Sequence, residues 1–243
     1  MKVITFIAII LIAGAIAGTI LGILNQGIVE PYIEQAIVLE NEKAASEGGE
    51  IINPVEFNNY RLWQRGGEIA AGTILGTSIA ALFGIVFAYS RQSIPGSTNK
   101  KKALTLAGIM WFVLFLVPAL KYPANPPAVG DPETIYYRQS LYVAYLAISG
   151  FTALGVGLLY EKVRAIHSKK VMIVSAIYAV IMVASYLALP PNPDAINAPM
   201  DLVAGFRLAS GFTMSIFWGL LGIILGALWD KTRPHETAKI AMV

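Results

Sequence analysis

The chain lacks the residues on which most metal centres and covalent catalysts depend. Its 243 residues include no cysteine and only two histidines, His167 and His235. It can therefore form no disulfide, no thiolate metal site and no thiol nucleophile. The HExxH, Walker and Gly-x-Ser-x-Gly motifs are also missing, so the sequence gives no sign of an enzyme and we expect none.

Charge is the second scarce property. Charged residues make up 14% of the chain and hydrophobic residues 56%, whereas about 25% of an average soluble domain is charged. One soluble core could not hide so much apolar surface from water, so a lipid bilayer is the expected solvent. The sequence has no basic tract with interleaved aromatic residues, and nucleic acid is not an expected partner.

Six apolar stretches are each long enough to cross a bilayer core about 30 Å thick, and none contains a charged residue. They run over about 4–24, 69–89, 103–120, 140–160, 171–189 and 208–229. The first exceeds the apolar core of a secretion signal, so we expect a retained span. The sequence predicts an all-α polytopic membrane protein with one domain over 1–243 and outer loops at 25–68, 121–139 and 190–207.

The distribution of charge predicts the orientation of these spans. With six spans, 12 of the 18 lysines and arginines fall on the side of the two termini, and 12 of the 15 acidic residues fall on the opposite side. Basic residues are concentrated on the cytoplasmic side of membrane proteins. We therefore expect a multi-pass protein of the plasma membrane with both termini in the cytoplasm.

An arginine precedes every second span, and this spacing suggests an internal repeat. Arg65, Arg138 and Arg207 are separated by 73 and 69 residues, and the spans that follow them end in FAYSR, LLYEK and ALWDK. The pattern predicts three repeated helical hairpins in the same orientation. The alternative is that inner basic residues and aromatic belts recur in any protein built from membrane hairpins.

Glycines recur at small-xxx-small spacing within three of the spans. Such faces allow membrane helices to pack closely, and we expect that role here. The faces are Gly14-Gly18-Gly22, Gly72-Gly76, Gly211-Ser215-Gly219 and Gly222-Gly226.

The three arginines also mark a candidate site at the outer face. Each lies near a helix N-terminus, where the helix dipole disfavours a cation, so a carboxylate partner is expected. The candidate partners are Glu68 for Arg65, Asp131 or Glu133 for Arg138, and Asp201 for Arg207. These groups could form a charged vestibule that admits an ion, or they could be salt bridges that hold the loops and anchors that snorkel.

Two further groups of polar residues lie in the first outer loop. Glu30 and Glu34 fall on one face of a predicted helix and could attract a hard cation, although a solvated amphipathic segment has the same pattern. Asn25 and Gln26 end the first span, where their amide oxygens could coordinate an ion or cap the helix. The sequence identifies no ligand set for a bound metal.

Three segments of the chain resemble the CbtA family of cobalt transporter subunits. They are LNQGIVEPYIEQA, LVPALKYPANPPAVGDPETIYYRQ and LASGFTMSIFWGLLGIILG, and the resemblance extends over nearly the whole chain. It implies a multi-span permease component that works with a small single-span, histidine-rich subunit similar to CbtB. A divalent metal such as cobalt would then be the transported substrate and not a resident cofactor.

We therefore expect a membrane permease subunit for uptake of a divalent metal ion, with cobalt as the first candidate. The competing hypothesis is a non-transporting accessory or scaffold subunit of a larger membrane complex. That hypothesis accounts for the absence of charge within the spans without any substrate.

Overall fold

The computed structural model describes residues 2–46, 48, 53–127, 129–163 and 169–235. Over these ranges the regular structure is entirely helical, and six helices are long and apolar enough to cross a membrane, which confirms the predicted all-α class and the number of membrane-capable helices. The three-hairpin repeat and the orientation of the termini stay predictions. The helices are α1 (Val3–Ile28), α2 (Glu30–Ser46), α3 (Pro54–Ser90), α4 (Asn99–Trp111), α5 (Val117–Lys121), α6 (Ile135–Val163), α7 (Lys170–Ala188) and α8 (Met200–Thr232). A π-helical turn, η1 (Phe112–Leu116), joins α4 to α5, and a 3-10 turn, η2 (Pro132–Thr134), precedes α6.

The chain divides into two compact units, which are described separately. Unit 1 contains Met1–Gly108 and Ala204–Val243, and unit 2 contains Ile109–Val203. Unit 1 therefore holds α1, α2, α3, most of α4 and most of α8. Unit 2 holds η1, α5, η2, α6 and α7. The single membrane domain expected from the sequence stays a prediction.

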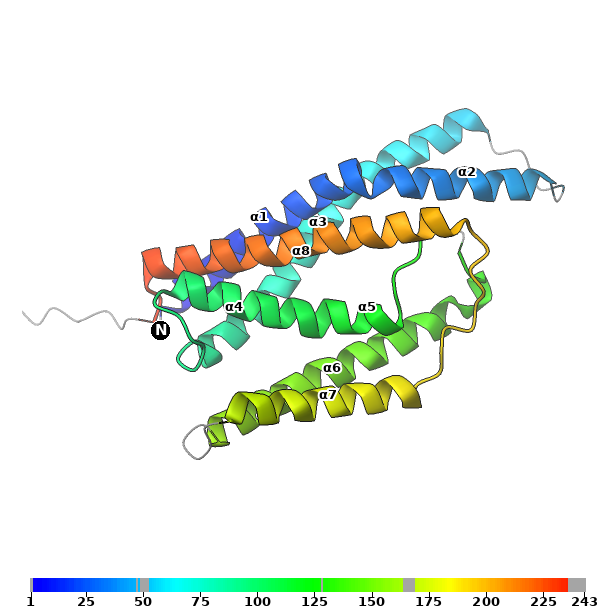
Figure 1. Ribbon diagram of the computed structural model, residues 1–243. Helices are drawn as coiled ribbons and strands as arrows, with labels where there is room; N and C mark the ends of the chain where they lie inside the picture. The colour runs from blue at the N-terminus through cyan, green and yellow to red at the C-terminus, as the bar shows by residue number, and fades with distance from the viewer. Residues whose placement is uncertain (1, 47, 49–52, 128, 164–168, 236–243) are drawn as a thin grey trace, which may run out of the picture. The chain divides into compact units, whose positions relative to one another are not determined.

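The glycines of α1 and α3 bring these two helices into direct backbone contact in unit 1 (Figure 1). A Cβ atom added at Gly14 would lie 2.6 Å from the Cα of Thr77, and one added at Gly18 would collide with the carbonyl oxygen of Gly72. Hydrocarbon provides no hydrophobic drive for helix association, so close van der Waals packing of this kind must supply it. The packing role predicted for these glycines is confirmed.

The glycines of α8 divide into two groups. A Cβ added at Gly222 would lie 2.8 Å from the Cβ of Ala107, and one added at Gly226 would lie 2.6 Å from the Cα of Lys100, so this face packs closely on α4. At Gly211 and Gly219 an added Cβ would meet nothing within 4 Å among the described residues. The close packing predicted for these two glycines is therefore not found in the described structure.

One end of unit 1 brings the start of α1 and the end of α8 together. The backbone N–H of Lys2 donates to the carbonyl oxygen of Pro234 at 2.8 Å. Next to this contact, the ring of Trp229 meets Phe6 and Phe87 edge-on, and the Arg91 guanidinium lies 5.9 Å from the Trp229 ring centre. The start of the first span and the end of the last span therefore lie at the same end of the unit.

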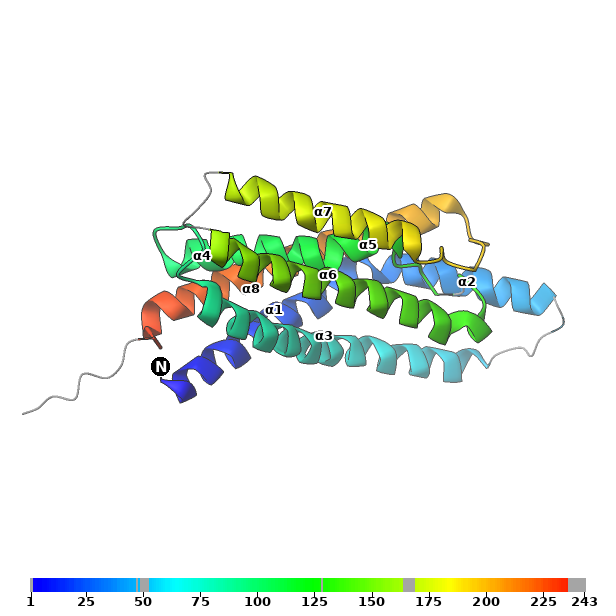
Figure 2. The same cartoon turned by 90° about the horizontal axis from the view of Figure 1, so that it is seen from below.

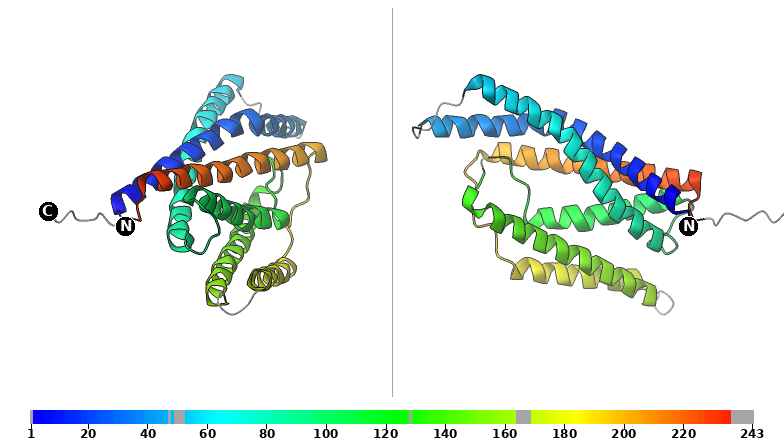
Figure 3. Two further views of the ribbon diagram at one scale, coloured as in Figure 1. Left: turned by 60° about the vertical axis from the view of Figure 1, so that its left-hand side comes forward. Right: turned by 180° about the vertical axis from the view of Figure 1, so that it is seen from behind.

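The predicted outer loop 25–68 is largely helical. It comprises the last turn of α1, the whole of α2 and the first part of α3, which returns alongside α2 (Figures 1 and 3). The helix α3 starts early because the Asn53 side chain accepts a hydrogen bond from the N–H of Val55 at 3.0 Å and Pro54 occupies the first helical position. With 37 residues α3 is about 55 Å long, well above the thickness of a bilayer core.

In unit 2 the helix α6 packs against α7 and against the η1–α5 segment. Helices α6 and α7 lie side by side in every view (Figures 1, 2 and 3). Five residues form the buried core between these elements: Val117, Tyr122, Leu141, Tyr145 and Met182. The π-helical turn lies next to this core, and the sequence analysis did not predict it.

The contact between α1 and α3 can be tested by adding one methyl group. We expect Gly18→Ala to lower the free energy of unfolding by about 1–3 kcal/mol, because its Cβ must displace the Gly72 backbone. Gly211→Ala is the matched control, since its Cβ meets open space. Thermal unfolding of both purified variants in detergent measures the difference, and equal stability of the two would refute the close contact.

Candidate functional site

An ion-pair cluster lies where α2 and α3 run together beyond the first span, and we define it as Glu30, Glu34, Arg61 and Arg65. Glu30 is 6% exposed, and its Oε1 accepts hydrogen bonds from Arg61 Nη2 and from Arg65 Nε, the latter at 3.1 Å. Arg65 Nη2 also pairs with Glu34 Oε1. The two carboxylates are thereby balanced by two guanidinium groups, which reduces the desolvation cost of the buried Glu30.

The partners of Arg65 differ in part from those expected. The sequence predicts Glu68, one turn further along the same helix, whereas the ion pairs are made with the two glutamates of α2. The reason is that α2 lies beside α3 and directs its acidic face toward the arginines. Glu68 lies within electrostatic range of Glu30, Arg61 and Arg65.

The two amide side chains at the end of α1 extend this cluster. Gln26 Nε2 donates to the carbonyl oxygen of Arg65 at 2.5 Å. Asn25 hydrogen-bonds to Glu68, while its own Oδ1 is buried and has no hydrogen-bond partner among the described residues. A buried acceptor without a partner costs about 1–3 kcal/mol, so a cation or water at Asn25 Oδ1 would be stabilising.

A pocket of about 410 Å³ lies between α2 and the first part of α3, next to the ion-pair cluster. Its polar lining includes Glu34, Asn41, Asn58, Arg61 and Arg65, and its apolar lining Ile37, Val38, Phe57 and Leu62. The acidic and basic side chains of the cluster therefore form part of its wall. The structure thus brings together six of the residues selected from the sequence: Asn25, Gln26, Glu30, Glu34, Arg65 and Glu68.

In unit 2 two of the candidate residues of the predicted second outer loop, Asp131 and Arg138, contact Asp194, which the sequence analysis did not select. Asp194 Oδ2 accepts hydrogen bonds from the Asp131 N–H at 2.9 Å and from the Thr134 hydroxyl at 2.7 Å, and it pairs with Arg138 Nε at 2.9 Å. Gly130 is required beside it, because its φ of +98° disfavours a side chain and an added Cβ would lie 2.5 Å from Asp194 Oδ2.

The carboxylate that pairs with Arg138 is therefore not one of the two expected. The sequence predicts Asp131 or Glu133, but Asp131 Oδ1 instead accepts from the Glu133 N–H at 2.9 Å and caps the turn η2. Glu133 is exposed. Asp131 still contributes through its carbonyl oxygen, to which Arg138 Nη2 donates at 3.0 Å. Asp194 belongs to the proline-rich loop after α7, and only the fold brings it to Arg138.

The remaining pair, Asp201 and Arg207, lies in α8. Asp201 is exposed in the first turn of this helix, where the dipole stabilises an acidic side chain. The pairing of Asp201 with Arg207 stays a prediction. Arg65 and Arg207 belong to unit 1 and Arg138 to unit 2, so the predicted common vestibule of the three arginines also stays a prediction.

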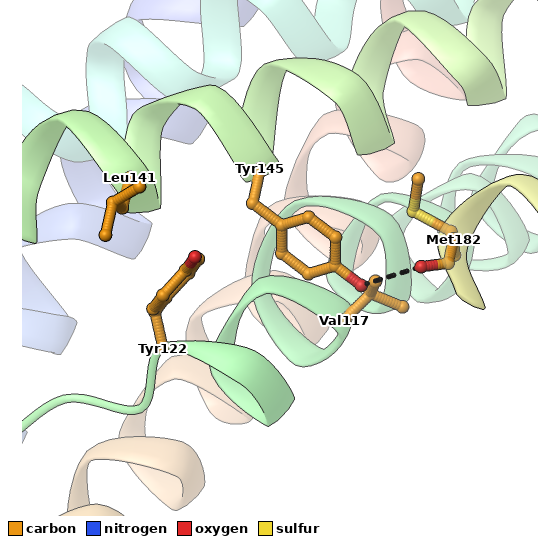
Figure 4. Packing of buried hydrophobic residues seen from close by; sticks show 5 residues of the cluster. All are labelled: Val117, Tyr122, Leu141, Tyr145 and Met182. Atoms are coloured by element: carbon orange, nitrogen blue, oxygen red, sulfur yellow. Dashed lines mark hydrogen bonds between the residues drawn. The ribbon is translucent and has the colours of Figure 1, made fainter. Parts of the chain in front are cut away.

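Hydrogen bonds join the C-terminal ends of α5 and α7 in unit 2. Tyr122 follows α5 and donates its hydroxyl proton to the carbonyl oxygen of Pro190 at 2.6 Å. Burial, together with the nearby Tyr137, raises the pKa of Tyr122, so this donor stays protonated. Lys121 Nζ donates to the carbonyl oxygen of Tyr186 at 2.6 Å and lies 4.3 Å from its ring centre. Figure 4 shows Tyr122 beside Tyr145 in the buried core of unit 2.

Metal-binding side chains do not gather in threes in the described part of the chain. No group of three histidine, aspartate or glutamate side chains there could hold one metal ion. His167 lies outside the described residues. His235 Nδ1 accepts a hydrogen bond from the Trp229 indole at 3.1 Å.

The charge of Glu30 can be removed without changing the shape of its side chain. We expect Glu30→Gln to destabilise the protein by about 3 kcal/mol, because it leaves Arg61, whose side chain is 13% exposed, without its buried carboxylate. Glu40→Gln, at an exposed position of the same helix, should be neutral. Thermal unfolding of both variants in detergent provides the comparison, and an unchanged melting temperature for Glu30→Gln would contradict the structural role of this carboxylate.

Comparison with known proteins identifies one matching protein family. The family model described as probable cobalt transporter subunit (CbtA) matches residues 3–230. Neither a curated protein nor a solved structure matches the chain. The match includes all six membrane-capable helices almost in full, together with every residue of the two outer clusters described above. On this evidence the chain belongs to the CbtA family of probable cobalt transporter subunits.

Proposed function

We propose that the protein is a membrane permease subunit for uptake of a divalent metal ion, with cobalt as the first candidate. The observation that carries this proposal is the family match over residues 3–230 of a chain with six membrane-capable helices. The convergence of candidate polar residues at the outer end of unit 1 supports it further. The metal is substrate in this proposal and not a resident cofactor.

The permease lies in the plasma membrane with both termini in the cytoplasm. The hydrogen bond between Lys2 and Pro234 supports the location of both termini on the same side of the membrane, because it joins the start of α1 to the end of α8. The excess of basic residues on that side supports its cytoplasmic location. The three-hairpin repeat is likewise part of the proposal, and the packing of α1 on α3 supports its first hairpin.

Uptake begins with the acidic outer surface, which concentrates cations by long-range attraction. The ion then reaches the pocket between α2 and α3, where Glu34 lines the wall beside Arg61 and Arg65. Because the arginines neutralise the carboxylates, the pocket holds a cation only loosely and can release it. The unpaired Oδ1 of Asn25 offers a neutral oxygen ligand next to Glu68, at the entrance to the span.

The transporter acts with at least one partner. The family description names a subunit, which supports a complex. A small single-span subunit similar to CbtB, with a histidine-rich segment, would add the imidazole ligands that suit borderline divalent metals and that are scarce in this chain.

The second candidate is an accessory subunit that does not itself transport. One observation favours it: in the outer cluster of unit 1, Glu30 and Glu34 already have arginine partners, so these carboxylates are satisfied without an ion. Purification in mild detergent separates the two hypotheses. A stoichiometric complex with an unrelated enzyme, together with unchanged metal uptake in a deletion strain, would favour the accessory role.

The uptake proposal is tested with cells that lack the gene. We expect the wild-type gene to restore cobalt accumulation, and Asn25→Ala to lower the rate about tenfold, the effect of losing about 1.4 kcal/mol of interaction with the ion. Gln35→Ala on the exposed face of α2 is the control and should restore full accumulation. Radioactive or mass-spectrometric measurement of cell-associated cobalt and nickel gives the result. Equal accumulation with and without the gene would exclude the proposed function.

A further inference from the structure

Two hydroxyl groups and one backbone carbonyl, from three elements of unit 2, meet inside the unit. We call this group the hydroxyl cluster; it consists of the side chains of Ser149 and Tyr178 and the carbonyl of Val113. Ser149 is 0% exposed, and its hydroxyl donates to the carbonyl oxygen of Val113 at 2.6 Å. The Tyr178 hydroxyl lies 2.7 Å from Ser149 Oγ. Because the single proton of Ser149 goes to the carbonyl, Tyr178 must donate to Ser149, and its own oxygen keeps lone pairs available.

The hydroxyl cluster lies near the middle of the membrane spans. Val113 is in the span Asn99–Lys121, Ser149 in Pro132–Tyr160 and Tyr178 in Val171–Ala188, in each case well away from the ends. A helix in hydrocarbon has every backbone group satisfied internally, so polar side chains at this depth need a reason.

The backbone is irregular at the same place. The π-helical turn Phe112–Leu116 contains Val113, and the N–H of Val117 bonds to the carbonyl oxygen of Phe112 in place of the usual α-helical partner. This wider turn accompanies the contact of the Val113 carbonyl with Ser149. Single π-turns inside α-helices occur frequently at functional sites.

A second buried polar atom lies next to this turn. The indole N–H of Trp111, immediately before η1, is buried and has no hydrogen-bond partner among the described residues. Buried donors of this kind are usually satisfied by a bound water molecule. A water molecule beside the turn could therefore accept a hydrogen bond from the Trp111 indole.

Helix packing alone is a weak explanation for these features. Each hydrogen bond between membrane helices contributes only a small stabilisation on average. Two such bonds gain little to offset an irregular turn and an unsatisfied indole. The α1–α3 contact of the same chain includes a hydroxyl pair too, Thr19 with Thr73 at 2.8 Å, but there both helices stay regular and glycines provide the close packing.

Further hydroxyl groups connect this depth to the outer end of unit 2. Tyr145 is 2% exposed and donates to the carbonyl oxygen of Met182 at 3.3 Å, and its ring lies 6.1 Å from that of Tyr122 (Figure 4). Tyr122 in turn donates to the carbonyl oxygen of Pro190, in the loop that also carries Asp194. In the described conformation both tyrosines are packed in the buried core of unit 2.

We propose that the hydroxyl cluster is a binding station for a hydrated divalent cation within unit 2. Its hydroxyl and carbonyl oxygens accept hydrogen bonds from the waters of the ion, and the ion passes without meeting a fixed charge. The proposal rests on the proposed function, of which it names an internal site. It requires that the cluster be reached by water when the core of Tyr122 and Tyr145 opens.

Because the chain has no cysteine, one introduced thiol reports on this site alone. Ser149→Cys is a change of one atom, and Val180→Cys on α7 is the control at similar depth, with its side chain 68% exposed on the helix surface. The full-length protein in native membranes is treated with a small positively charged thiosulfonate reagent, with and without CoCl₂. The double variant Ser149→Cys/Tyr178→Phe repeats the measurement, because a thiol could itself bind cobalt.

We expect Ser149→Cys to react at least about tenfold faster than Val180→Cys, with cobalt slowing the reaction less in the double variant. Equal rates for the two single variants would overturn the proposal, because the cluster would then be dry. Fast modification that cobalt does not slow would also overturn it, because the site would hold water but no cation. Protection that is identical in the single and double variants would assign cobalt binding to the introduced thiol and overturn the role of Tyr178.

Transport provides the second readout. Tyr178→Phe removes one oxygen and should lower cobalt uptake about tenfold, whereas Tyr186→Phe on the same helix should not. If Tyr178→Phe transports normally, the station is refuted while the permease assignment stands. If no variant or wild-type protein transports cobalt but the thiol at position 149 is hydrated and protected through Tyr178, the permease assignment fails and the cation site stands.

Discussion

Hydrocarbon accepts neither isolated charge nor unpaired polar groups, and the structure of this protein depends on that constraint. Six helices satisfy their own backbone groups and carry their charged residues at the ends. Polar side chains inside the spans bond across helices, as Thr19 does to Thr73 at 2.8 Å and Ser149 to Val113 at 2.6 Å. Since apolar surface gains nothing by leaving one apolar solvent for another, glycine contacts between backbones hold α1 to α3.

Charged groups fix the ends of these helices, where water is available. At the C-terminal end of α8, Asp230 accepts from the N–H groups of Asn99 and Lys100, both at 3.0 Å, and so caps α4 with a residue of α8. In the segments that join the spans, Glu30 of unit 1 and Asp194 of unit 2 each bind several donors from segments distant in the sequence. In the proposed permease these networks leave the outer entrances polar but nearly neutral, which favours release of an ion over tight capture.

The sequence predicted what depends on composition and local spacing. Span number, helix class and the packing faces of Gly18 and Gly72 follow from hydropathy and small-residue spacing, and the structure agrees. The sequence could not predict contacts between residues that only the folded course of a loop brings together. Asp194 reaches Arg138 only through the fold, although the four-residue spacing of Arg61 and Arg65 could have indicated that both face α2. The π-turn at Phe112–Leu116 leaves no pattern in a uniformly apolar run.

Single-cysteine labelling of intact cells tests most directly whether six helices with uncharged central segments cross the bilayer and place their charged ends at its two faces. The chain has no cysteine of its own, and Ala44, Ser97 and Ala195 are exposed positions between or beyond the spans. A membrane-impermeant thiol reagent should label Ala44→Cys and Ala195→Cys in intact cells, and Ser97→Cys only after lysis. Labelling of Ser97→Cys in intact cells, or recovery of the folded chain from the soluble fraction, would contradict this account.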